Sequence, residues 1–174
     1  MSDRIPRIRA ALQAHLDTDD IAIRDESHLH AGHAGANTGL GFETAKGLVH
    51  QGYRVVIAAR NPDKGHAAVE ALRGGCLGAQ VRFEPLDLDS QASVRSFAAR
   101  LRPSESSLDL LVNNAGVLAL PTRELTQEGF ERQLGVNYLG HFLLTSRLLP
   151  LLLASPVPRV VQLSSLAHLG SLDP

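Results

Sequence analysis

The sequence predicts an α/β fold: a doubly wound, mostly parallel β-sheet with helices on both faces. One observation is a glycine-rich stretch, residues 34–41, whose three glycines have the spacing G-x-x-x-G-x-G and precede a helical run over residues 42–49. The other is the rest of the chain, where apolar runs of strand length alternate with helical patterns from residue 54 onward. Such alternation is typical of parallel strands joined by crossover helices.

Length and composition allow one globular domain and argue against several classes of protein. The chain has 174 residues, of which 44% are hydrophobic and 20% charged, so it can bury a core. Its net charge of −1, with scattered basic residues, argues against nucleic acid or an anionic membrane as a partner. A single cysteine, Cys76, fits a reducing compartment. The N-terminus lacks the apolar stretch of a secretory leader, and the apolar run 148–154 is too short to span a bilayer. We therefore expect a cytoplasmic protein with no membrane span.

The expected elements follow from apolar periodicity and from the residues that bound each run. Two adjacent glycines end the helix that follows the second strand, and a continuous apolar run precedes residue 113. We expect helices over residues 4–16, 63–73, 91–101 and 130–153, and strands over residues 55–59, 81–88, 108–112 and 159–165.

The first strand of the sheet is the least regular expected element. The position just before the glycines is held by residues 28–33, a histidine-rich stretch, although a central parallel strand should be a nearly continuous apolar run. Residues 21–24 instead alternate like a strand. We hypothesise that Ile21–Ile23 supplies the missing strand, with the histidine loop bulging between it and the glycines. The strand order should be 3-2-1-4-5 if this first strand forms.

The glycine stretch has the chemistry of a phosphate-binding turn. Glycine lets the backbone approach a ligand closely, and a helix start offers free N–H groups to a phosphate. The spacing alone is weak, but the order glycine loop, helix, strand, basic residue is how a dinucleotide half-site is built. Arg60 follows the second strand, nineteen residues after Gly41. Arginine at this position accommodates a 2′-phosphate, which favours NADP(H), although NAD(H) stays possible. The alternative is a solvent-facing arginine at a helix entry.

Three segments together resemble the short-chain dehydrogenase/reductases. They are the glycine pattern, the sequence N-N-A-G at residues 113–116 directly after a strand, and residues 129–145, which are similar to the retinol-dehydrogenase-like branch. The resemblance covers about residues 34–174. It implies a Rossmann-like NAD(P)-binding domain that moves a hydride between NADP(H) and a small-molecule alcohol or carbonyl of lipophilic character. The chain departs from the pattern at Ala34, where the family usually has threonine.

The resemblance also assigns roles to particular residues. It implies that Asp87 and Leu88 contact the adenine, that Asn137 holds a water of the proton relay, and that Ser165 hydrogen-bonds the substrate oxygen. Two alternatives stay open: Asp87 or Asp89 could cap the next helix, and Asn137 could have a structural part. The implied cofactor-binding residues are Gly35, Asn37, Thr38, Gly39, Leu40, Gly41, Arg60, Asp87, Leu88, Asn113, Ala115 and Gly116.

The acid–base pair of that family, Tyr-x-x-x-Lys, is not found in the chain. The tyrosines are Tyr53 and Tyr138, and neither has a lysine four residues on, because the lysines are Lys46 and Lys64. The tyrosine exchanges the alcohol proton, and the lysine lowers its pKa and holds the nicotinamide ribose. We therefore expect an inactive domain that is truncated after its fifth strand, with that strand exposed at the sheet edge.

Residues 1–36 resemble a second family, the opening of a BolA protein. The match comprises a first helix, a first strand and the loop D-E-S-H-L-H-A-G-H-A-G-A. In that family this loop can carry a ligand of an iron–sulfur cluster shared with a monothiol glutaredoxin. His28, His30 or His33 could correspond to it, but the later half with the second ligand is absent, so we assign no metal site. We expect a BolA-like fragment over residues 1–33 before the NAD(P)-binding domain of residues 34–174, and keep a glutaredoxin partner as the alternative function.

Overall fold

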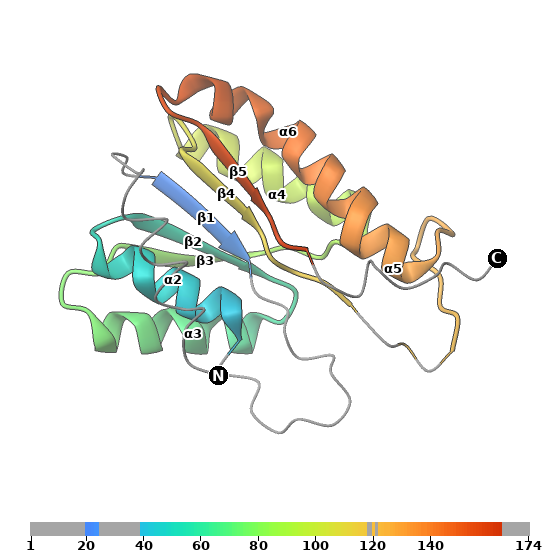
Figure 1. The fold of residues 1–174 in the computed structure, drawn as a ribbon, viewed down its shortest axis with the longest axis horizontal. Helices are drawn as coiled ribbons and strands as arrows, with labels where there is room; N and C mark the ends of the chain where they lie inside the picture. Colours follow the sequence, from blue (N-terminus) through green and yellow to red (C-terminus); the bar gives the residue numbers. More distant parts are fainter. Residues whose placement is uncertain (1–19, 25–38, 118–119, 121, 165–174) are drawn as a thin grey trace.

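The fold is a parallel sheet between two layers of helices. The structure is a computed structural model, and it describes residues 20–24, 39–117, 120 and 122–164. Its described strands form a five-stranded sheet in the order β3-β2-β1-β4-β5, and every neighbouring pair is parallel (Figure 1). This confirms the expected strand order. The elements are β1 (Asp20–Arg24), α2 (Leu40–His50), β2 (Arg54–Ala59), α3 (Pro62–Gly75), β3 (Val81–Pro85), α4 (Gln91–Ser104), β4 (Leu110–Asn113), α5 (Arg132–Leu134), η2 (Gly135–Gly140), α6 (His141–Ala154) and β5 (Arg159–Gln162).

The central strand β1 is the one hypothesised from Ile21–Ile23. Ile21 lies opposite Val55 of β2 on one side and opposite Leu110 of β4 on the other. The strand belongs to this sheet, although the sequence alone led us to expect it in a separate N-terminal fragment. Residues 25–38, which contain the histidine loop, connect β1 to α2 and lie outside the described part of the chain. The expected helix over residues 4–16 lies outside it as well.

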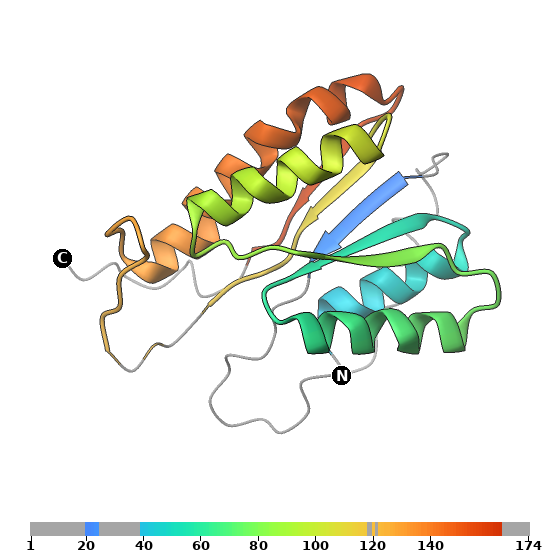
Figure 2. The ribbon, with the colours of Figure 1, turned by 180° about the vertical axis from the view of Figure 1, so that it is seen from behind.

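The two helix layers follow from the alternation of side chains along each strand. Helices α2 and α3 cover one face of the sheet, and α4 and α6 cover the other (Figures 1 and 2). Val55 and Ile57 of β2 join the buried cluster of the α2–α3 layer, whereas Val56 and Ala58 join that of the α4–α6 layer. The sheet is therefore buried on both sides near its centre, which is why β2 and β4 read as continuous apolar runs.

The helices α3 and α4 begin at polar caps. The Asn61 side chain accepts a bond from the Lys64 amide at 3.0 Å, and Pro62 takes the first helical position. Ser90 caps α4 by accepting a bond from the Ser93 amide at 3.3 Å. The alternative in which Asp87 or Asp89 caps this helix is therefore wrong.

The helix expected over residues 130–153 starts two residues later than expected, and its winding changes along its length. It begins at Arg132, and its second part, η2, is wound as a π-helix. Glu131 sets the start, because its carboxylate accepts bonds from the amides of Gln133 at 2.9 Å and Leu134 at 2.8 Å. Phe130 stays in the preceding turn, where its carbonyl accepts a bond from the Thr126 amide. Periodicity detects the apolar face of such a segment but not its N-cap or its π-turn.

We expect Glu131→Ala to lower the free energy of unfolding by about 1 kcal/mol near neutral pH, because it removes an N-cap. The bonds from the Gln133 and Leu134 amides lower the pKa of the Glu131 carboxyl. A carboxyl whose pKa is lowered by folding stabilises the fold above its unfolded pKa, and this stabilisation is lost as the pH falls through the lowered folded value. Urea unfolding of both proteins at about pH 7 and about pH 3 brackets the ordinary glutamate pKa. The difference should shrink in acid, and a difference that grows there contradicts the assignment.

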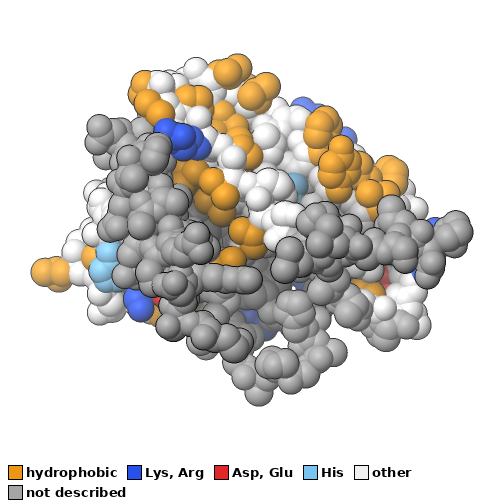
Figure 3. All heavy atoms as spheres, in the orientation of Figure 1, with side chains coloured by type: hydrophobic (Ala, Val, Ile, Leu, Met, Phe, Trp, Pro, Cys, Tyr) orange, Lys and Arg blue, Asp and Glu red, His pale blue; other side chains and the backbone are white. Residues whose placement is uncertain are grey.

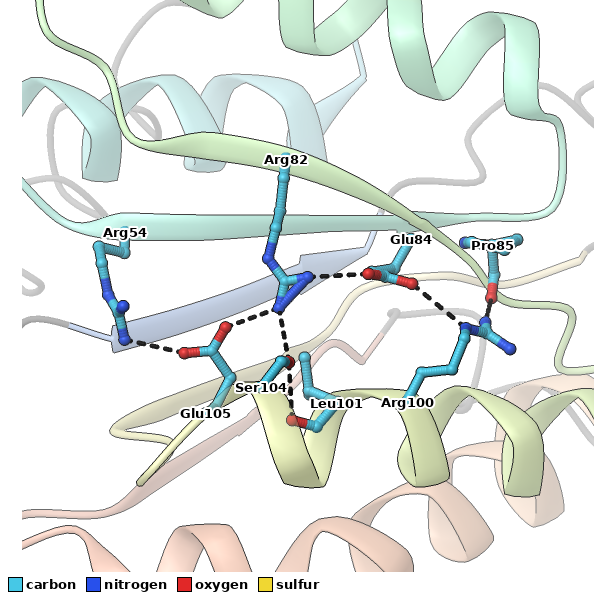
Figure 4. Close-up of polar contacts among 8 residues, drawn as sticks. All are labelled: Arg54, Arg82, Glu84, Pro85, Arg100, Leu101, Ser104 and Glu105. Carbon is cyan, nitrogen blue, oxygen red and sulfur yellow. Dashed lines mark hydrogen bonds and ion pairs between the residues drawn. The ribbon is translucent and has the colours of Figure 1, made fainter.

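A chain of ion pairs fastens the edge strand β3 to helix α4 (Figure 4). Arg82 of β3 donates to Glu84 at 2.8 Å and to Glu105, just after α4, at 2.6 Å. Arg54 reaches the other oxygen of Glu105 at 2.8 Å, and Arg100 donates to Glu84 at 3.3 Å. These side chains are partly exposed, so each pair is worth only about 0.2 to 1 kcal/mol.

Apolar side chains gather on the surface over α6 and β5, in the view of Figure 3. Strand β5 pairs with β4 alone among the described strands, and Val160 is 46% exposed. The expectation of an exposed fifth strand is thereby met. Within the described residues, no helix is both long enough and apolar enough to cross a membrane. The exposed apolar residues of this region are Leu134, Tyr138, Phe142, Leu149, Leu153, Val157, Val160 and Leu163.

Candidate functional site

Several described residues among those singled out from the sequence lie at one edge of the sheet. Parallel strands end at a common edge, and this edge holds the start of α2, the exits of β2 and β3, and the loop after β4 (Figure 1). Ligands of doubly wound sheets bind outside the carboxyl ends of the strands, where the strand order reverses. Here the order reverses at β1, between β2 and β4.

The start of α2 leaves its first amides available. Gly39 is the N-cap residue with extended backbone (φ −73°, ψ 158°), and no described side chain caps the helix. Its carbonyl accepts bonds from the amides of Phe42 and Glu43. The amides of Leu40 and Gly41 precede the first intrahelical bond, so they can be donors to an anion. Gly41 is buried and Leu40 is 38% exposed. The absence of a competing side chain fits a diphosphate at this position.

Arg60 lies at the exit of β2, on the same edge. It is half-buried, and its guanidinium makes no hydrogen bond or ion pair with another described residue. Asp89, from the exit of β3, is close enough that the Arg60 charge acts on its carboxylate. The guanidinium therefore lies near the carboxyl edge of the sheet, and its N–H groups donate to no other described residue. This fits a 2′-phosphate as its partner.

Asp89 is paired chiefly with a residue that sequence reasoning did not single out. Arg132 of α5 lies 3.4 Å from its carboxylate and also pairs with Glu124. Burial raises the pKa of the Asp89 carboxyl, while the Arg132 and Arg60 charges act in the opposite direction. Asp87 accepts a bond from the Asp89 amide at 3.0 Å and so shapes the exit of β3.

Asn113 ties three elements together. It is 2% exposed, and its side-chain nitrogen donates to Thr145 of α6 at 3.2 Å and to Gln162 of β5 at 3.1 Å. These bonds link β4 to β5 and to α6. Beyond Asn113, Ala115 is buried and Gly116 is exposed. Leu88, an expected adenine contact, has its side chain in the core at 3% exposure.

The Asn137 side chain is bonded to the loop after β4. Its oxygen accepts a bond from the Val117 amide and its nitrogen donates to the Val117 carbonyl, each at 2.8 Å. The structural part left open for Asn137 is therefore present, and its role toward a water stays a prediction. One turn on, His141 Nε2 contacts the Ala115 carbonyl at 2.8 Å. Sequence reasoning missed this contact, although the four-residue spacing from Asn137 places both on one helix face.

Several expected residues lie outside the described part of the chain. They include the catalytic candidate Ser165 and the loop of His28, His30 and His33. Ser164, the neighbour of Ser165, is described. It follows β5 and is exposed. The cofactor-binding candidates outside the described part are Gly35, Asn37 and Thr38.

A cavity of about 290 Å³ lies elsewhere, at the amino ends of β2 and β3. Arg54, Arg82 and Glu105 line it, and they are engaged in the ion pairs of Figure 4. It is at the opposite edge of the sheet from the residues described above, so we do not assign the site there.

Comparison with models of protein families shows the family of the chain. The family model for short chain dehydrogenase matches residues 31–172. The chain belongs to the short-chain dehydrogenase family. The match begins ahead of the glycine-rich stretch and includes both the loop after β4 and the helical segment that contacts it. The family part of the expected resemblance is thereby confirmed.

Three proteins similar to this short-chain dehydrogenase chain illustrate the relationship. Retinol dehydrogenase 13 of Mus musculus is 49% identical over 140 residues, covering 80% of this chain and 42% of the relative. Retinol dehydrogenase 11 of Mus musculus is 42% identical over 163 residues, covering 94% of this chain and 50% of the relative. The Pseudomonas aeruginosa RhlG/NADP active-site complex aligns with a TM-score of 0.69 at 28% identity, covering 91% of this chain and 59% of that one. The chain thus spans half or less of the length of these two dehydrogenases.

Proposed function

We propose that this chain binds NADP(H) at the carboxyl edge of its sheet. The observation that carries the proposal combines two neighbouring features: no described side chain caps the start of α2, and Arg60, at the exit of β2, makes no hydrogen bond or ion pair with another described residue. The first amides of α2 would hold the diphosphate, and Arg60 the 2′-phosphate. The NADP complex of the similar Pseudomonas aeruginosa protein supports the choice of cofactor.

The reaction that we propose for the complete site is hydride transfer between the nicotinamide and an alcohol or carbonyl group. The bound cofactor supplies the hydride chemistry. The chain's own contribution is to orient its ligands: Ser165 to hydrogen-bond the substrate oxygen, and the loop of residues 113–116 to line the cofactor ribose. The names of the retinol dehydrogenases among the relatives support a lipophilic substrate.

We further propose that the chain as printed binds the cofactor without turnover. The sequence contains no Tyr-x-x-x-Lys, so no tyrosine is placed to exchange the alcohol proton. Incubation with NADPH and retinal, followed at the NADPH absorbance, checks this. We expect no turnover, and oxidation of NADPH in proportion to retinal would contradict it.

Calorimetric titration with NADPH and NADH tests the binding proposal. We expect NADPH to bind about 10- to 100-fold more tightly than NADH, because a charge-assisted bond is worth about 1.5 to 3 kcal/mol. Arg60→Ala should remove most of this preference and leave NADH affinity nearly unchanged. Arg102→Ala is the matched control, since Arg102 is exposed in the last turn of α4 and should leave both affinities as they are.

The outcomes separate two parts of the proposal. If neither nucleotide binds, the dinucleotide site itself is wrong. If both bind with equal affinity, the site stands and the role of Arg60 is wrong.

A further inference from the structure

Three polar side chains, four residues apart on one helical segment, hold successive parts of the chain after β4. Thr145 Oγ1 accepts from the Asn113 side chain at 3.2 Å, and His141 Nε2 contacts the Ala115 carbonyl at 2.8 Å. Asn137 makes both of its bonds to the Val117 backbone at 2.8 Å. We call these three contacts the polar ladder.

The ladder has matched spacings. Four residues of an α-helix, as from His141 to Thr145 in α6, advance by about 6 Å, and two residues of an extended chain advance by about 6.6 Å. Asn137 lies one turn earlier, in the π-wound η2. Rungs at every fourth helical residue therefore meet every second residue of the loop, with the two segments running in opposite directions. A contact of this regularity sets the position of the loop along the helix, not only its distance from it.

His141 is the middle rung and the most buried of the three helix residues. It is 3% exposed, whereas Asn137 and Thr145 are half-buried. A backbone carbonyl can only accept, so the imidazole carries a proton on Nε2 and donates it to Ala115. Loss of this donor would leave the carbonyl of a buried residue without its bond, which is unfavourable.

Gly116 lies between Ala115 and Val117, the two residues of the loop that His141 and Asn137 contact. Gly116 is exposed and makes no backbone hydrogen bond to another described residue. A Cβ placed on it would lie 3.4 Å from the Asn137 side-chain oxygen, so the loop packs directly on that rung. The ladder thus holds the loop from the side of the helix, and the exposed Gly116 stays accessible to a ligand.

We propose that His141 is a positioning residue, which through the polar ladder holds the loop of residues 113–117 in register for the dinucleotide. The inference rests on the proposed function for the identity of the ligand. His141 is not among the expected catalytic or cofactor-binding residues. The inference gives it the role of fixing the position of the peptide groups that line the ribose.

The test compares His141→Leu, which removes the donor, with His141→Gln, whose terminal nitrogen can reach a similar position. Calorimetry should show His141→Leu to bind NADPH about tenfold more weakly than the wild type, with His141→Gln within about threefold of it. His50→Leu is the matched control: His50 also contacts a backbone carbonyl, that of Lys46, but it is exposed at the end of α2. It should leave NADPH affinity unchanged.

Hydrogen exchange over residues 113–117 provides a readout that needs no nucleotide. Exchange there should rise in His141→Leu and return toward the wild-type rate in His141→Gln. If wild type fails to bind NADPH while this exchange pattern holds, the proposed function is wrong and the ladder stands. If His141→Leu binds NADPH like the wild type, or if leucine and glutamine act alike, the positioning role is overturned. Should His141→Leu not fold, Thr145→Val removes the outer rung at nearly constant volume, and unchanged exchange in that variant also overturns the ladder.

Discussion

Replacing Leu148 by alanine should lower the free energy of unfolding by about 3 kcal/mol or more. Leu148 is fully buried in the middle of α6, in the cluster that joins this helix to α4 and to the sheet. Truncating such a leucine loses the transfer free energy of the removed groups and leaves a cavity, which together cost about 2.7 to 5 kcal/mol. A domain has only about 5 to 15 kcal/mol of net stability, so the loss should be a large fraction of the total. Urea unfolding followed by circular dichroism measures it.

The control is Leu153→Ala on the same helix. Leu153 is 72% exposed, so the substitution removes little buried surface and should change the stability by less than about 0.5 kcal/mol. Both substitutions change the same side chain in the same helix, and helix propensity therefore cancels between them. Equal effects at the two positions would mean that α6 does not pack on the sheet through Leu148.

Most of the sheet could be predicted because parallel strands carry their own signal. Residues 55–59 of β2 and 110–112 of β4 are buried, and each stretch reads as an unbroken apolar run. Strand β1 is harder to predict, because the histidine loop, and not the glycine-rich stretch, follows it directly in the sequence. The strand-like alternation of Ile21–Ile23 was the available signal, and the pairing of that stretch with β2 and β4 bears it out.

The candidate site was predicted in its residue types but not in its contacts. Backbone donors at a glycine turn and an arginine after a strand are visible in the sequence, because their chemistry depends on local order. The polar ladder depends on how a helix and a loop are placed against each other. Its four-residue spacing from Asn137 to Thr145 is visible in the sequence, but the partners on the loop are not. The cap at Glu131 and the π-turn after it were missed for the same reason, since both adjust the helix to its neighbours.

Replacing Gly140 by alanine should destabilise the protein by about 2 to 3 kcal/mol, at the upper end of the cost of overpacking. Gly140 is the last residue of η2, where it lies against the exit of β3. A Cβ built on it would be 2.9 Å from both the Cβ and the backbone oxygen of Leu88, and 3.2 Å from the Gly135 carbonyl. A backbone oxygen cannot swing aside like the end of a side chain, so the helix or the β3 exit must shift.

The sign of this effect separates packing from propensity. Alanine is about 1 kcal/mol better than glycine in a helix interior, so propensity alone predicts stabilisation. Gly47→Ala is the matched control, because Gly47 lies inside α2 and a Cβ there meets nothing within 4 Å. Thermal and urea unfolding should show Gly47→Ala more stable than the wild type and Gly140→Ala less stable. If the two substitutions shift stability in the same direction, the close approach of η2 to Leu88 is wrong. A displacement of the β3 exit should also weaken NADPH binding in Gly140→Ala, because this exit holds Asp87 and Leu88, for which the family resemblance implies adenine contacts.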